Sequence, residues 1–225
     1  MNKSELFELY EILGLILPGA VFVYGMSQLF PGFISFSFTN NLSAGALGVF
    51  VILSYAVGHM VQVGGEYVEI FWRKMRGDPT EWIREGKKQL FTDYQIKKLE
   101  QEIPDRLGID RNQFHLGELN RKQWLNIHKQ MYIAVVAAGN GKRLEKFHAI
   151  YTMCRGLVAA LLLLAIFSLF RFSPETWYVP SLLLVFAGLL FYRMAKFERH
   201  AVHELFLQFL QLPKEGTEKK KEKQD

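Results

Sequence analysis

Five polar side chains recur along one predicted helix at a spacing that places them on a single face. They are Tyr55, His59, Gln62, Glu66 and Glu69, which follow one another at intervals of 4, 3, 4 and 3 residues. Residues three and four apart lie on the same side of an α-helix. The first three fall in an uncharged apolar run, where histidine and glutamine need a partner because lipid tails cannot satisfy them. We interpret this polar stripe as hydrogen bonding between helices, with a pore lining, a proton path or a ligand contact as alternatives.

A second polar set lies where a helix is predicted to enter the third apolar run, at the membrane depth of Glu66 and Glu69. Its members are Arg143, Glu145, His148, Tyr151 and Arg155. Guanidinium and carboxylate groups that meet at this depth would pair strongly and fix the second span against the third. We interpret the set as a structural clasp. The alternative is a gate whose ion pairs rearrange when a partner or ligand arrives, with pH sensitivity supplied by His148 or His59.

Other motifs argue weakly for catalysis. Arg143 and His148 match the Arg-x4-His spacing of HEPN-type ribonucleases, but side chains five residues apart point about 140° away from each other on a helix. His200, His203 and Glu204 offer ligands to a metal, although no third histidine or cysteine is placed beside them. The single cysteine, Cys154, excludes an intramolecular disulfide and a thiolate zinc site. With no phosphate-binding glycine loop and no hydrolase or metalloprotease motif, we expect no enzyme, no cofactor and no metal.

The elements that must position these residues are four apolar helices. Half of the 225 residues are hydrophobic, and their long runs are concentrated in 12–63 and 156–192. We predict an all-α integral membrane protein with spans at about 12–30, 44–63, 151–172 and 177–192, within segments 1–65 and 151–192. The last two apolar runs are short, so these spans require Arg155 and Arg193 to reach the headgroups. A shallow re-entrant hairpin is the alternative.

Basic residues beside the spans predict the orientation, because cytoplasmic loops carry an excess of lysine and arginine. The 31–43 loop has none and the 171–176 turn has one, Arg171. The other flanks carry Arg73, Lys74, Arg76, Arg84, Lys87, Lys88, Lys142, Arg143, Lys146, Arg155, Arg193, Lys196 and Arg199. We therefore expect a multi-pass protein of the inner membrane with both termini cytoplasmic. Membrane-edge charges also explain the net charge of +5, so nucleic acid is not an expected partner.

The segment 66–150 is predicted to be a helical cytoplasmic domain between the second and third spans. Its start extends the second span. Asp78 begins a short helix, Thr92 begins another through a capping box, and Asn120 begins a third. From Lys142 a last helix should continue into the third span. The 193–212 helix is amphipathic and should pack on this domain, on a second subunit or on the membrane surface, and the charged tail 213–225 is predicted to be disordered.

Two patches resemble small uncharacterised bacterial membrane proteins. They are Ser54-Tyr55-Ala56-Val57-Gly58-His59 with Gln62, and Arg143-Leu144-Glu145-Lys146-Phe147-His148 with Tyr151 and Arg155. The resemblance covers less than a fifth of the chain and implies no activity. Small residues in the second span, such as Gly45, Gly48 and Gly58, would let another helix come close, which favours a homo-oligomer.

These features predict a non-enzymatic, oligomeric sensor or effector, or a pore-like protein, with bacterial stress or phage defence as one setting. In this hypothesis the cytoplasmic domain receives a signal or a protein partner, and the spans in the bilayer respond. One alternative is a membrane-tethered scaffold that docks a soluble partner through the domain and the 193–212 helix. The other is a membrane-bound ribonuclease or hydrolase that uses Arg143 and His148.

Overall fold

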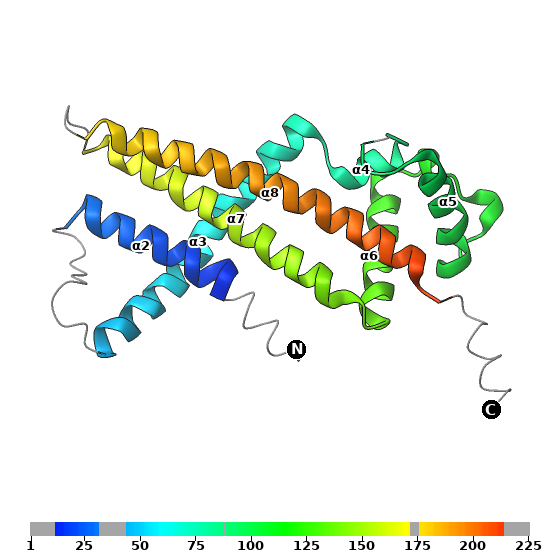
Figure 1. Cartoon of the computed structure of the whole chain (residues 1–225), viewed down its shortest axis with the longest axis horizontal. Coiled ribbons are helices and arrows are strands. Elements are labelled where there is room, and N and C mark those ends of the chain that lie inside the picture. The colour runs from blue at the N-terminus through cyan, green and yellow to red at the C-terminus, as the bar shows by residue number, and fades with distance from the viewer. Residues whose placement is uncertain (1–11, 32–43, 88, 172–175, 214–225) are drawn as a thin grey trace. The chain divides into compact units, whose positions relative to one another are not determined.

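The structure is a computed structural model that describes residues 12–31, 44–87, 89–171 and 176–213. The described residues form helices and no strand, as the sequence predicts (Figure 1). Their order is η1 (Ile12–Ile16, a π-helix), α2 (Leu17–Leu29), α3 (Ala44–Arg76), α4 (Pro79–Arg84), α5 (Asp93–Leu107), η2 (Arg111–Gln113), η3 (Leu116–Glu118), α6 (Arg121–Ala137), α7 (Gly141–Leu169) and α8 (Tyr178–Gln211). The predicted tail from residue 214 onward lies outside the described residues.

Within the described part of the chain, four helices are long and apolar enough to cross a membrane. They begin at Ile12, Ala44, Gly141 and Tyr178. The two short apolar runs of the sequence belong to helices of 29 and 34 residues, so length does not require a re-entrant hairpin. At about 1.5 Å per residue, each exceeds the roughly 30 Å of a bilayer's hydrocarbon core.

The chain divides into two compact units. Unit 1 comprises Met1–Met75 and His148–Phe197, and unit 2 comprises Arg76–Phe147 and Glu198–Asp225. These limits differ from the predicted segments 66–150 and 193–212. The last turns of α3 belong to unit 1, where the ring of Trp72 contacts that of Phe191 on α8 with centroids 5.1 Å apart.

In unit 1, α2 crosses α3, and α7 lies beside α8 (Figure 1). The cluster of buried side chains between α7 and α8 is formed by Tyr151, Cys154 and Met194. The sequence predicts a kink at Pro18 and Gly19. At this point the structure has a π-helix that changes to an α-helix at Leu17, and Pro18 lies in the first turn of α2, where its missing N–H is tolerated.

Unit 2 is held together by one large apolar core. Trp124, Leu99, Ile103 and Met131 of α5 and α6 are fully buried in it, together with Phe206 and Phe209 of α8. Of the three surfaces considered for the 193–212 helix, its part from Glu198 onward therefore packs within unit 2. No break separates this part from the predicted fourth span, because α8 continues from Tyr178 to Gln211.

Capping residues begin the helices of unit 2 where the sequence predicts. Asp78 accepts a hydrogen bond from the backbone N–H of Thr80, at the start of α4. Thr92 and Asn120 each form a capping box, at the starts of α5 and α6. These signals are local, which is why they could be recognised without the tertiary structure.

Candidate functional site

The centre of unit 1 is a buried glutamine that joins three helical segments. Gln62 of α3 is only 8% exposed. Its amide nitrogen donates to the backbone carbonyl of Gly14 in η1 and to that of Thr152 in α7, the latter at 3.2 Å. Its amide oxygen accepts a hydrogen bond from Arg155 at 3.2 Å. One side chain thus binds η1 and α7 to α3.

The proline that follows Gly14 removes one backbone donor that the Gly14 carbonyl would have in an α-helix. In an α-helix, the N–H of residue 18 would donate to the carbonyl of residue 14. Pro18 has no N–H, so it leaves the Gly14 carbonyl without that donor. Gln62 supplies a replacement from a different helix.

Arg155 extends the cluster toward the end of α3. It donates to the Glu69 carboxylate at 2.5 Å, and Arg73 donates to the other oxygen of the same carboxylate at 2.9 Å. The Arg155 and Glu69 side chains are only 16% and 17% exposed. The Arg155 guanidinium also lies over the ring of Tyr151, 5.9 Å from its centroid. We call Gln62, Glu69, Tyr151 and Arg155 the Gln62 cluster.

Glycines allow the helices to approach closely enough for the Gln62 cluster to form. A Cβ atom on Gly19 of α2 would overlap the backbone of Ser54, and one on Gly58 of α3 would overlap the carbonyl of Leu15. A Cβ on Gly65 would lie 3.1 Å from the Arg155 side chain. The crossing of α2 and η1 over α3 is therefore a contact between backbones, which no larger residue at Gly19 or Gly58 would permit.

The predicted polar stripe of α3 is divided by this packing. Gln62 is buried and Glu69 is half-buried, but Tyr55, His59 and Glu66 are exposed. The buried residues of α3 are Ser54, Gly58, Val61, Gln62 and Gly65. At about 100° per residue, the centre of this buried face lies to one side of the stripe, so only the stripe's near edge turns inward. Within this chain the five residues of the stripe therefore do not share one environment.

The predicted clasp is also divided. Tyr151 and Arg155 lie with Glu69, and His148 interacts electrostatically with both Arg155 and Glu69. The Arg155–Glu69 ion pair between α3 and α7 is of the kind that the sequence predicts. Arg143 belongs to unit 2 and pairs there with Glu204 at 3.4 Å.

Glu145 also belongs to unit 2. The pKa of Tyr132 in α6 is raised, mainly because this side chain is partly buried and secondly because the Glu145 carboxylate is near it. His148 is exposed, with its ring 6.3 Å from that of Tyr151. The five residues therefore do not form one set of ion pairs.

The candidate metal ligands on α8 face different neighbours. His203 stacks on Phe91 with ring centroids 4.9 Å apart, and His200 lies 6.3 Å from the ring of Phe147. Glu204 accepts a hydrogen bond from Gln208 at 2.9 Å. Within the described ranges, no three histidine, cysteine or acidic residues are placed to hold a metal ion.

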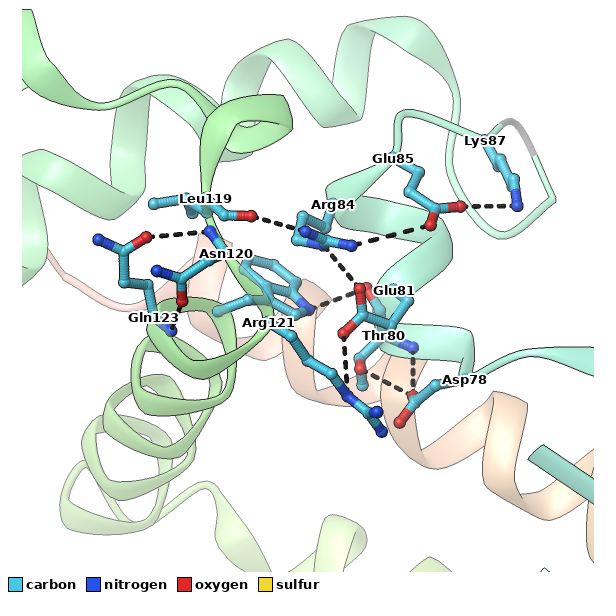
Figure 2. A network of polar contacts seen from close by, with 11 residues as sticks. Asp78, Thr80, Glu81, Arg84, Glu85, Lys87, Leu119, Asn120, Arg121 and Gln123 are labelled. Carbon is cyan, nitrogen blue, oxygen red and sulfur yellow. Dashed lines mark hydrogen bonds and ion pairs between the residues drawn. The ribbon is translucent and has the colours of Figure 1, made fainter. Parts of the chain in front are cut away.

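Unit 2 contains a second polar network, which sequence reasoning missed (Figure 2). Arg84 of α4 donates to the carbonyl of Leu119 at 2.6 Å and pairs with Glu81 at 2.6 Å. The indole N–H of Trp124 donates to the carbonyl of Thr80 at 3.1 Å. These bonds tie α4 to the start of α6. Their acceptors are mostly backbone carbonyls, which leave no signal in the sequence.

Both networks connect helices through hydrogen bonds and ion pairs, and their geometry is that of a joint between helices. The Glu69 carboxylate is shared by two guanidinium groups, so it is held as an ion-pair acceptor and is poorly placed to remove a proton from a substrate. Sequence reasoning missed the partners Gly14 and Thr152; the one available signal was the proline four residues after Gly14.

Comparison with known proteins yields no match to a protein-family model, to a curated protein or to a solved structure.

Proposed function

We propose that this chain is a non-enzymatic, oligomeric protein of the bacterial inner membrane, with unit 1 in the bilayer and unit 2 on the cytoplasmic side. Unit 2 receives a signal or a partner, and unit 1 responds as a pore or membrane-perturbing element. An effector or sensor in stress or phage defence is one setting for this activity.

One observation carries the proposal: polar side chains lie on the outside of an apolar helix. Tyr55 and His59 are exposed on α3, in a stretch that is otherwise apolar. In a bilayer this surface would meet hydrocarbon, which offers no hydrogen-bond partner. A second subunit or a water-filled path would supply one. The buried Gln62 does not support a pore lining, because its amide is fully engaged between helices.

The structure of α7 and α8 supports a link between the units. Each is a continuous helix that contributes residues to both, with α7 changing units after Phe147 and α8 after Phe197. A helix has a stiff hydrogen-bonded backbone, so a displacement of its unit 2 end is transmitted along its axis. Such a displacement would change the geometry of the ion pair between Glu69 of α3 and Arg155 of α7.

Reconstitution in liposomes tests the membrane response. The purified wild type should release an entrapped dye or carry current across a planar bilayer. His59→Ala and Glu66→Ala should change that release, whereas Met60→Ala, at a 73% exposed apolar position of the same helix, should not. Tight vesicles with the wild type in both anionic and neutral lipid would overturn the pore proposal.

The orientation has its own test. The test inserts a reporter after Asp110, between α5 and η2 in unit 2. A reporter that works only in the cytoplasm should be active there, and one that works only in the periplasm should be inactive. A periplasmic reporter signal at this site would contradict the assignment of unit 2 to the cytoplasmic side.

A scaffold function is the second candidate, and exposed apolar side chains on unit 2 favour it. On α6, Leu125 is 46% exposed and Ile133 is 55% exposed, while Tyr132 lies near Leu125 on the same face, seven residues away. A docked partner would cover these residues. Loss of one stoichiometric partner with Leu125→Glu, but not with His59→Ala, would favour the scaffold over the pore.

A further inference from the structure

One face of α3 combines small, apolar and polar residues and is exposed along its length. We call it the α3 outer face, and its members are Gly48, Ile52, Tyr55, His59, Val63 and Glu66. All are exposed; Ile52, for example, is 72% exposed. Their intervals of three and four residues place them along one side of the helix.

The polar atoms of this face form a compact group. The rings of Tyr55 and His59 meet edge to face with centroids 4.8 Å apart. A tyrosine hydroxyl can both donate and accept a hydrogen bond, and a neutral imidazole has one donor and one acceptor nitrogen. The pair therefore offers both kinds of group side by side on the outside of an apolar helix.

Gly48 lies about 10 Å along the helix from Tyr55, at 1.5 Å per residue. A Cβ atom placed on Gly48 would meet nothing within 4 Å, so the backbone is open to an approaching helix. At Gly58, by contrast, the space that a Cβ atom would occupy is already filled by the backbone of η1. Small residues at the surface of a membrane helix are the usual place for close helix contact.

We propose that the α3 outer face binds the same face of a second copy of this chain in a parallel, two-fold pair. A two-fold interface brings one patch against itself, so it requires a self-complementary surface. The Tyr55 and His59 pair meets this requirement, because Tyr55 of either copy can bond His59 of the other. This inference rests on the proposed membrane location of unit 1 and specifies the oligomer.

Cysteine cross-linking in native membranes tests the pairing. Cys154, the only cysteine, is buried and can be replaced by serine to give a cysteine-free background. Ile52→Cys and Val63→Cys then lie on the outer face, and both variants keep Tyr55 and His59. Val49→Cys and Met60→Cys are matched controls, with native side chains 58% and 73% exposed but turned roughly 100° from the centre of the face.

Oxidation should give a disulfide-linked dimer with Ile52→Cys and Val63→Cys and monomer with both controls, since a disulfide requires Cα atoms within about 7 Å. Equal cross-linking at all four positions, cross-linking at the controls alone, or none at any position would overturn the proposed face.

A second measurement uses dilution of labelled protein in liposomes. Energy transfer between labelled copies reports the pairing. With His59→Leu, half-maximal energy transfer should need about tenfold more protein per lipid, because two interhelical hydrogen bonds are lost. Met60→Leu should pair as the wild type does. Unchanged pairing with His59→Leu would refute the role of His59. Cross-linking at the outer face without dye release would uphold the interface and refute the pore, and dye release without cross-linking would do the reverse.

Discussion

Replacing Gln62 with methionine should loosen unit 1 by a predictable amount. Methionine keeps the length and unbranched shape of glutamine, so packing changes little, but it removes three hydrogen bonds. Interhelical hydrogen bonds in a membrane protein contribute about 0.6 kcal/mol each on average. The loss of three therefore predicts a decrease of about 2 kcal/mol in the free energy of opening unit 1.

Cys154 provides the assay for this opening. It is the only cysteine, it is fully buried, and it lies one turn or less from Thr152 and Arg155 on α7. Its alkylation in mild detergent should require unit 1 to open. A loss of 2 kcal/mol corresponds to alkylation about thirtyfold faster, since 1.4 kcal/mol is a factor of ten. Glu66→Met, an exposed position on the same helix, is the control and should change the rate less than about threefold.

The effects of Pro18→Ala and Gln62→Met should depend on each other, because both changes act on the carbonyl of Gly14. Pro18→Ala restores an N–H four residues after Gly14, which offers the Gly14 carbonyl a backbone donor. In that background, Gln62→Met should accelerate alkylation about threefold less than in the wild type, the equivalent of one hydrogen bond. Strictly additive effects would show that the N–H of residue 18 does not replace Gln62 at the Gly14 carbonyl. A Gln62→Met protein that reacts as slowly as the wild type would refute the whole account of the cluster.

Three further substitutions probe the packing of each unit. Gly58→Ala should lower the thermal unfolding midpoint in detergent, because its methyl group would overlap the backbone of η1 and cost at least about 1 to 3 kcal/mol, whereas Gly48→Ala should not. Arg106→Met should speed amide hydrogen exchange at the end of α8, because Arg106 donates to backbone carbonyls there. The local free energy of unfolding should fall by about 2 kcal/mol. Arg121→Met is the control and should have little effect, because the Arg121 side chain is 71% exposed. Trp124→Phe should keep the stacking in the unit 2 core but destabilise that unit by about 1 kcal/mol in thermal unfolding, because its hydrogen bond to α4 is lost.

Local signals carried most of the helix assignment. The uncharged apolar runs predicted the four long helices, and capping residues such as Asp78, Thr92 and Asn120 predicted where shorter ones begin. The distribution of charges predicted that a guanidinium and a carboxylate would pair between the second and third of the long helices. The predictions of the long helices and of the helix starts succeeded because hydrophobic length and capping act over a few residues of chain.

The sequence alone determined that this chain forms four long apolar helices and that a polar stripe follows one side of α3. Only the tertiary structure decided which edge of that stripe is buried, which carbonyl 48 residues away binds Gln62, and that Val202 and Phe206 of α8 belong to the core of unit 2. The physical reason is that helical periodicity gives the relative directions of side chains on one helix, whereas the direction of the neighbouring helix is set by long-range packing. At α3 that packing depends on how closely two backbones approach at Gly19 and Gly58, and no local pattern records it.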